Sequence, residues 1–417
     1  MEAYDYQVRG AEQAYDILRR YGMVYIAWEE RCGKTLTSIL TVEQSKAKRC
    51  LVVTKKKALS GWVETLIAYK PEKLFTVINY HGLYTQHKEM RKIKGKMEQV
   101  TVQTLKPEFK DKFDVVILDE AHAYLSAYPK TGAIANIVQE VCYQLPVILL
   151  SATPAAQGYQ LLFHQLNMSK YSPFDGFKDF YKFFNVYGIP EYVYTQKGKQ
   201  ITYNNVKSTV WERVKHLFLT MTRKELNFEH EPEDVLHYIE LDSNTKRLYN
   251  ECIVDEMLIL GELEIPLDSS MKLRTTLHML EGGVFKHEDN YGILGNTEKI
   301  DAIKRDFGDE TTNTIMYHYK AELSKLSQAF KRTQLLQATS FAEGVDLSGQ
   351  ANLIIYSQDF STAKHSQRRA RQANRNRATE IKVHFYLVKG GLSEQVYKTV
   401  SLNKQNFVDK VFERKTL

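Results

Sequence analysis

The sequence predicts an α/β fold with two lobes, each built on a parallel sheet. In the first half, apolar runs of strand length begin at residues 23, 113 and 147, and the first is followed by the helical pattern LTSILTVEQSKAK. In the second half, NLIIYSQ and KVHFYLV have strand-like apolar content, with helical patterns between them. The length of 417 residues allows two to three domains of about 150 residues each.

Composition restricts the class of protein. Hydrophobic residues make up 43% of the chain, which is enough for packed cores, and the formal net charge of +7 permits an anionic partner without demanding one. The four cysteines show no C-x-x-C pair or metal-ligand spacing, so we expect reduced thiols and a cytoplasmic protein. The first residues lack a signal pattern, and no apolar run is long enough for a membrane span.

A candidate phosphate-binding loop follows the first strand. The stretch WEERCGKT ends in Gly33, Lys34 and Thr35, although Trp28 replaces the first glycine of the G-x-x-x-x-G-K-[ST] pattern. In a strand, loop and helix arrangement, backbone N–H groups at the start of the helix face the phosphates. Lys34 would then reach the β- and γ-phosphates and Thr35 would hold Mg²⁺. The alternative is a chance GKT in a basic turn.

A second candidate group follows the strand that begins at residue 113. This strand ends in Asp119-Glu120-Ala121-His122. A carboxylate at the end of a buried strand is costly unless it meets a cation. We therefore expect Asp119 to bind Mg²⁺ through its water shell and Glu120 to position and polarise an attacking water. The alternative is an exposed acidic turn.

A third strand ends in Ser151-Ala152-Thr153, and the order GKT, DEAH and SAT resembles that of superfamily 2 helicases and translocases. Further segments resemble the SNF2-like branch, and together they cover nearly the whole chain: CLVVTKKKALSGWVETL, VINYHGL, FLTMTRKEL, LDSNTKRLYNECI, TEKIDAI, NTIMYHYKAEL, ATSFAEGVDLSGQANLIIYSQ and HSQRRARQANRNR. The compact length resembles phage and prokaryotic members, including phage branch-migration helicases.

The resemblance implies two RecA-like lobes with ATP and Mg²⁺ bound in the cleft between them. Their boundaries are expected at 1–168 for the first lobe, 169–232 for a helical and β-hairpin insertion with a bridge, and 233–417 for the second lobe. Several residues receive expected roles from the family pattern. The residues expected to contact the nucleotide are Gln7, Arg31, Cys32, Gly344 and Asp346. The residues expected to couple hydrolysis to movement are His122, Ser151, Ala152 and Thr153.

Two departures from the family pattern leave alternatives open. Arg31 stands where a glycine is usual, and it could contact a phosphate or lie on the surface. In the arginine motif, the family has two arginines three apart after a glutamine, but the register here is ambiguous. We expect Arg371 and Arg375 to be the arginine fingers, with Arg368 as an alternative. The alternative is that the segment HSQRRARQANRNR forms a basic helix that faces nucleic acid or solvent.

Nucleic acid is expected to cross both lobes through phosphate contacts without base reading. The candidates in the first lobe are Lys55, Lys56 and Lys57, unless they form a solvated loop. Trp62 could contact a base, but we expect it to pack within the protein. The segment EYVYTQKGKQITY predicts a hairpin, and Lys197 and Lys199 at its tip could meet DNA or serve the fold alone. The basic segment 87–96, expected in a loop or helix, could touch the duplex or form a solvated face, and we favour the solvated face.

These observations favour a monomeric, ATP-dependent DNA translocase that tracks on duplex or branched DNA and remodels junctions or forks, with replication and recombination proteins as possible partners. A strand-separating helicase and the motor subunit of a restriction or defence complex are the alternatives. A binding protein that only retains the fold is a third, but the intact Lys34, Asp119 and Glu120 argue against it.

Overall fold

The chain folds into two α/β units, Met1–Leu226 and Asn227–Leu417. The computed structural model describes residues 2–93, 96–195, 198–226, 232–338, 347, 349–362, 365, 380–403, 407 and 411–417. None of the helices in these ranges is long and apolar enough to cross a membrane. The predicted insertion, 169–232, lies for the most part in the first unit.

The first unit is built on a parallel six-stranded sheet with the order β10-β1-β7-β6-β2-β3. Its strands are β1 (Met23–Trp28), β2 (Arg49–Thr54), β3 (Leu74–Asn79), β6 (Val115–Asp119), β7 (Val147–Leu150) and β10 (Phe218–Met221). The three strands at the centre, β1, β7 and β6, are buried along nearly their whole length. Because all six strands run in the same direction, their carboxyl ends meet at one edge of the sheet, where α/β proteins bind ligands.

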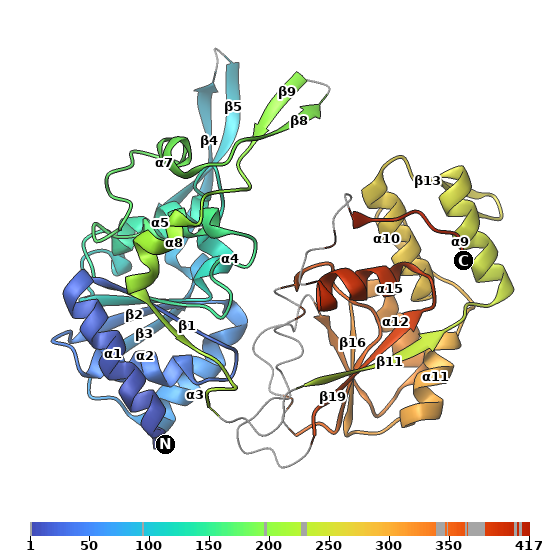
Figure 1. Ribbon diagram of the computed structural model, residues 1–417, viewed down its shortest axis with the longest axis horizontal. Coiled ribbons are helices and arrows are strands. Elements are labelled where there is room, and N and C mark those ends of the chain that lie inside the picture. The colour runs from blue at the N-terminus through green and yellow to red at the C-terminus, as the bar shows by residue number, and fades with distance from the viewer. Residues whose placement is uncertain are drawn as a thin grey trace. The chain divides into compact units, whose positions relative to one another are not determined.

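Helices cover both faces of this sheet. The helices are α1 (Asp5–Tyr21), α2 (Lys34–Glu43), α3 (Leu59–Tyr69), α4 (Ala121–Leu125), α5 (Ala133–Cys142), α6 (Leu162–Leu166), α7 (Phe180–Tyr187) and α8 (Thr209–Val214), and short 3₁₀ turns lie at Lys56–Ala58, Tyr80–Leu83, Pro107–Phe109, Tyr159–Leu161 and Lys215–Leu217. Figure 1 shows α1, α2 and α3 on one side of the sheet and α4, α5 and α8 on the other. The pattern LTSILTVEQSKAK is confirmed as a helix by α2.

Two antiparallel hairpins extend from the upper part of this unit in Figure 1. One consists of β8 (Glu191–Thr195) and β9 (Gly198–Thr202), which confirms the predicted hairpin. The other consists of β4 (Tyr84–Ile93) and β5 (Lys96–Leu105). The expectation of a loop or helix at 87–96 is therefore wrong. The segment lacks a helical apolar stripe and gains its structure by pairing with the following segment, where Val100 and Val102 alternate as in a strand.

The second unit has a parallel five-stranded sheet with the order β11-β19-β18-β16-β17. These strands are β11 (Glu233–Ile239), β16 (Asn313–Tyr317), β17 (Gln334–Gln337), β18 (Asn352–Ile355) and β19 (Lys382–Val388), and two small hairpins pair β12 (Met257–Leu260) with β13 (Leu263–Pro266) and β14 (Val284–His287) with β15 (Asn290–Ile293). Strands β18 and β19 confirm the predicted strands in NLIIYSQ and KVHFYLV.

The helices of the second unit bury two groups of apolar side chains. The described helices are α9 (Ser243–Asp255), α10 (Ser270–Glu281), α11 (Glu298–Phe307), α12 (Lys320–Ala329) and α15 (Leu392–Tyr397). Helix α15 continues into a π-helical turn at Lys398–Leu402. One group joins α9, α10 and α15, and the other joins α11 and α12 to the sheet. The prediction of an α/β fold with two RecA-like, parallel-sheet lobes is confirmed.

Candidate functional site

The loop between β1 and α2 has the strained backbone of a phosphate-binding loop. Gly33, the residue before α2, has a φ of 86°, and Arg31 has a φ of 67°. A Cβ atom added to Gly33 would lie 2.1 Å from the side-chain amide nitrogen of Gln7, so both the positive φ and this close approach favour glycine there. Arg31 keeps the left-handed backbone for which glycine is the usual choice and leaves its side chain exposed.

The Lys34 side chain folds back over this loop. Its Nζ donates to the carbonyl oxygens of Trp28, at 2.9 Å, and Glu29, at 3.0 Å. The ammonium is therefore held beside the first turn of α2, where backbone N–H groups have no partner within the helix. Thr35 occupies the second position of that turn. An ammonium, free N–H groups and a hydroxyl at the N-terminus of a helix together suit an anion such as a polyphosphate.

Gln7 supports the same loop from α1. Its side-chain oxygen accepts from the backbone N–H of Tyr4, at 3.0 Å, and its side-chain nitrogen donates to the carbonyl of Gly33, at 3.3 Å. The side chain is buried. The amide of Gln7 thus ties the first helix to the loop in this structure. The expected contact of Gln7 with the nucleotide stays a prediction. Cys32 is also buried, and burial raises the pKa of its thiol to about 12, so this thiol is uncharged at neutral pH.

Asp119 ends β6 and is fixed by residues of neighbouring strands and helices. Its Oδ2 accepts from the hydroxyl of Thr54, at 2.7 Å, and from the indole N–H of Trp62, at 2.9 Å. Tyr80 donates its hydroxyl to the Asp119 carbonyl, at 2.8 Å. Within the described part of the chain, no hydrogen bond reaches the other carboxylate oxygen, Oδ1. One oxygen is thereby oriented, and the other can accept from a hydrated cation.

The prediction that Trp62 packs is confirmed, since its side chain is only 2% exposed. No pattern in the sequence indicated its hydrogen bond to Asp119. A general rule could have indicated it, because a buried indole N–H usually finds an acceptor.

Trp62→Phe should lower the free energy of unfolding by about 1.5–3 kcal/mol, the usual range for a hydrogen bond to a charged group. The change keeps an aromatic ring in place and removes the N–H that orients Asp119. Urea unfolding followed by circular dichroism measures the loss. Trp211→Phe is the matched control, since the Trp211 indole N–H makes no hydrogen bond with the described residues and the side chain is half-buried. Equal losses in the two variants would contradict the role of this bond.

Glu120 lies directly beyond β6 in a left-handed backbone conformation, with a φ of 51° and a ψ of 41°. A residue with a side chain adopts this conformation at a cost, and such strain concentrates at functional sites. The Glu120 side chain is 24% exposed, so water can approach its carboxylate. A partly exposed carboxylate beside Asp119 can accept a hydrogen bond from a water molecule.

His122 links the ends of β6 and β7. Its Nδ1 lies 2.7 Å from the Ser151 hydroxyl, and that hydroxyl accepts from the backbone N–H of Thr153, at 3.0 Å. Burial, with Lys55 and Lys34 adding to the effect, lowers the pKa of His122 from 6.5 to about 3. The imidazole is therefore neutral at pH 7, and its 3.4 Å approach to Glu120 is not an ion pair at that pH. Ala152 lies between Ser151 and Thr153 in the chain, and its methyl side chain cannot form hydrogen bonds.

Acid should destabilise the protein in part through His122. Because the pKa is about 3 in the folded chain and 6.5 ordinarily, the unfolded chain takes up this proton first. The stability from this group is complete above pH 6.5 and is lost as the pH falls toward 3. Between pH 7.5 and 5, wild type should lose roughly 1–2 kcal/mol more than His122→Asn. Urea unfolding of both at the two pH values measures this difference, and parallel losses would contradict it.

Sequence reasoning missed an ionic contact that braces the phosphate loop. Arg223 follows β10, and its guanidinium lies 3.9 Å from the carboxylate of Glu29 and 3.7 Å from that of Glu30. Its backbone N–H donates to Glu29 at 2.8 Å. Because β10 pairs with β1, two segments nearly 200 residues apart meet at the carboxyl edge of the sheet. The loop is thus held by Gln7 on one side and by Arg223 on the other.

The described lysines that we predict to contact DNA lie at the surface of the first unit. Lys56 and Lys57 are exposed in the 3₁₀ turn after β2, and Lys55 is half-buried. Lys199 lies over the ring of Tyr192, with its Nζ 4.0 Å from the ring centroid. Their roles in binding DNA stay predictions.

Six of the predicted site residues lie outside the residues that the structure describes. They are Lys197, Gly344, Asp346, Arg368, Arg371 and Arg375. Their expected roles, including the register of the arginine motif, stay predictions.

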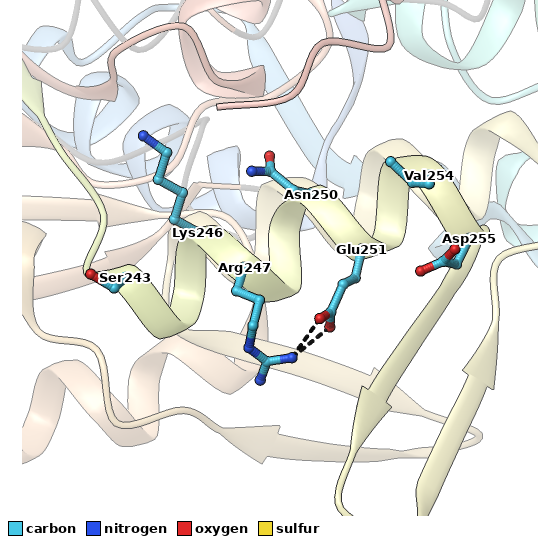
Figure 2. A pocket seen from close by; sticks show the side chains of 7 residues that line it. All are labelled: Ser243, Lys246, Arg247, Asn250, Glu251, Val254 and Asp255. Carbon is cyan, nitrogen blue, oxygen red and sulfur yellow. Dashed lines mark hydrogen bonds and ion pairs between the residues drawn. The ribbon is translucent and has the colours of Figure 1, made fainter.

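A surface groove of the second unit has a different character. Figure 2 shows its lining, which comes entirely from α9 and consists of Ser243, Lys246, Arg247, Asn250, Glu251, Val254 and Asp255. The Arg247 guanidinium already donates to both carboxylate oxygens of Glu251, at 2.6 and 2.8 Å. A groove on a single helix, with its arginine paired, lacks the converging strand ends that distinguish the loop site in the first unit.

Comparison with known proteins assigns a class to the first unit. Residues 1–156 match the family model described as the res subunit of type III restriction enzymes. The matched segment contains Gly33-Lys34-Thr35, Asp119-Glu120-Ala121-His122 and Ser151-Ala152-Thr153. This match supports the superfamily 2 helicase-type ATPase that the order of these motifs predicted.

The chain as a whole is similar to two solved structures of an archaeal protein. One is the SWI2/SNF2 ATPase core of Sulfolobus solfataricus in complex with dsDNA, with 14% identity, a TM-score of 0.42 and coverage of 96% of this chain and 91% of that one. The other is the SWI2/SNF2 ATPase core domain from the same organism, with 13% identity, a TM-score of 0.40 and coverage of 97% and 90%. No curated protein matches the sequence.

Proposed function

We propose that the protein is an ATP-dependent DNA translocase of the SNF2 type that tracks on duplex or branched DNA and remodels junctions or forks, as in branch migration. The observation that carries this proposal is the convergence of Lys34, Asp119, Glu120 and the His122–Ser151 pair at the carboxyl edge of one sheet. The preference for DNA over RNA rests on the SNF2-like order of the motifs along the chain.

The residues present fit ATP with Mg²⁺. Lys34 and the N-terminus of α2 supply positive charge for a polyphosphate, while Thr35 and the Oδ1 of Asp119 are hard oxygen ligands of the kind that Mg²⁺ and its waters prefer. When bound, Mg²⁺ would neutralise charge on the phosphate oxygens.

The chain's own residues would divide the work of hydrolysis. Lys34 would exchange its two loop carbonyls for phosphate oxygens, so that the loop is held first by the lysine and then by the nucleotide. Glu120 would orient a water and take its proton as the new oxygen–phosphorus bond forms and the bond to the leaving diphosphate breaks. The His122–Ser151 bond would transmit the change at β6 to the segment after β7, which is the expected coupling route.

The expected DNA contacts are sequence-independent and made mainly to phosphates, by Lys55, Lys56 and Lys57 and by the hairpin tip with Lys197 and Lys199. Reversing the charges of Lys197 and Lys199 tests the tip, and unchanged DNA affinity and junction activity would remove it from the interface. We further propose a monomer that works in the cytoplasm of a bacterium or a phage-infected cell with replication and recombination proteins.

The match of residues 1–156 to the res subunit family favours a second candidate function. The protein would then be the motor subunit of a restriction or defence complex, and a partner chain would supply the nuclease. Co-purification of a nuclease subunit with the tagged protein from its natural host would support this candidate. Translocation by the isolated chain would instead support the proposed DNA translocase.

ATP hydrolysis at fixed salt tests the proposal. The rate is measured with no nucleic acid, with single-stranded DNA, with plain duplex and with a four-way junction. We expect strong stimulation by duplex and a higher rate with the junction. Stimulation by single strands alone would favour a strand-separating helicase, and absence of hydrolysis under every condition would contradict the assignment of an independent motor.

A further inference from the structure

The β4–β5 hairpin has two faces of different chemistry. In its antiparallel register, Lys88 lies opposite Thr101, Met90 opposite Gln99 and Lys92 opposite Met97. Directly opposed residues point to the same side of a hairpin, and side chains alternate along each strand. One side therefore carries, among the described residues from 86 to 101, a set that we call the Lys88 face: Gln86, Lys88, Met90, Lys92, Met97, Gln99 and Thr101.

The opposite face carries both carboxylates of the hairpin, Glu89 and Glu98. Glu89 accepts from the guanidinium of Arg91 and lies 3.5 Å from the His87 ring. The hydrogen bond from Arg91 lowers the pKa of Glu89, so this carboxylate is ionised at neutral pH. The charges of that face thus largely satisfy one another within the hairpin.

The Lys88 face has two lysines and no carboxylate. All seven of its residues are exposed, and Met90 and Met97 are 56% and 59% exposed. Neither Lys88 nor Lys92 forms an ion pair with any residue that the structure describes. A hairpin of two strands has no core of its own, so neither its charge nor its exposed methionines are explained by folding.

We propose that the Lys88 face binds nucleic acid, with Lys88 and Lys92 on backbone phosphates and Met90 and Met97 against sugars and bases. The two lysines are four residues apart on one strand, or about 13 Å, which lets them reach two phosphates instead of one. A two-stranded ribbon is of a size that the major groove of a duplex admits. A surface with cations, amides and methionines but without carboxylates complements a polyanion with apolar bases. This inference rests on the proposed function and adds a contact element to it.

A pair of matched variants tests the face. Lys92→Glu and Lys96→Glu make the same change of charge near the same end of the hairpin, but Lys96 lies on the opposite face, since it pairs with Ile93. Affinity of the full chain for a fluorescent duplex is measured by anisotropy at several salt concentrations without nucleotide. We expect Lys92→Glu to weaken binding by on the order of tenfold and Lys96→Glu to change it much less.

Two double variants separate the lysines from the methionines. Lys88→Ala with Lys92→Ala should reduce the slope of log affinity against log salt by about 2, one for each lost phosphate contact. Met90→Gln with Met97→Gln should lower the affinity and leave that slope unchanged, and an unchanged affinity would remove the methionines from the interface.

The outcomes distinguish this inference from the proposed function. If the wild-type chain binds duplex and Lys92→Glu weakens binding no more than Lys96→Glu, the inference is overturned and the proposed function stands. If the wild-type chain binds no duplex and no junction, the proposed function falls and the inference falls with it. Hydrolysis of ATP without DNA should be unchanged in all of these variants, since the hairpin is not part of the nucleotide site.

Discussion

Glu120→Gln should reduce the turnover of ATP on the order of 10²–10⁴-fold, the range attributed to a general base, and leave nucleotide binding intact. The physical reason lies in the backbone. Glu120 directly follows Asp119 in a left-handed conformation, which sets the direction of its Cα–Cβ bond at the carboxyl edge of the sheet. Glutamine keeps the shape and the hydrogen-bonding oxygen of the side chain but cannot take up the proton.

Steady-state hydrolysis and equilibrium binding of a fluorescent ATP analogue measure these two effects separately. Glu140→Gln makes the same chemical change at an exposed position of α5 and should behave as wild type. If Glu120→Gln kept more than a tenth of the wild-type rate, Glu120 would not be the base. If it lost nucleotide binding to the same extent as turnover, its role would lie in holding the nucleotide.

Lys34→Ala should weaken nucleotide binding and lower turnover by on the order of 10²–10³-fold, as expected when a group that stabilises charge in the transition state is removed. In the structure, the ammonium already lies at the loop through the carbonyls of Trp28 and Glu29. Lys46→Ala, at an exposed position just beyond α2, makes the same change of charge and is the control. Equal activity of the two variants would contradict the assignment of a phosphate-binding loop.

The sequence was sufficient to predict the parts of the site that are local in the chain. The strand before Gly33, the helix after it and the strand that ends at Asp119 each have a periodicity that a short window reveals. Because parallel strands end at one edge of a sheet, predicting the strands also predicts that Lys34, Glu120 and Ser151 gather there.

The contacts that fix these side chains could not be predicted in the same way. Trp62 donates to Asp119 and Arg223 lies beside Glu30, and both pairs form between segments far apart in the chain. The hydrophobic pattern of a short segment does not indicate which distant residue its side chains will contact. The hairpin at β4 and β5 was missed for a related reason, since its first strand is polar on both faces and is defined only by its partner.

We propose that ATP hydrolysis drives movement along intact duplex DNA, and displacement of a third strand reveals such movement. A duplex carrying a triplex-forming oligonucleotide is incubated with the protein, ATP and Mg²⁺, and release of the oligonucleotide is followed over time. We expect ATP-dependent release by wild type, no release by Glu120→Gln, and a duplex that stays paired. Vigorous DNA-stimulated hydrolysis without any release of the third strand would contradict it.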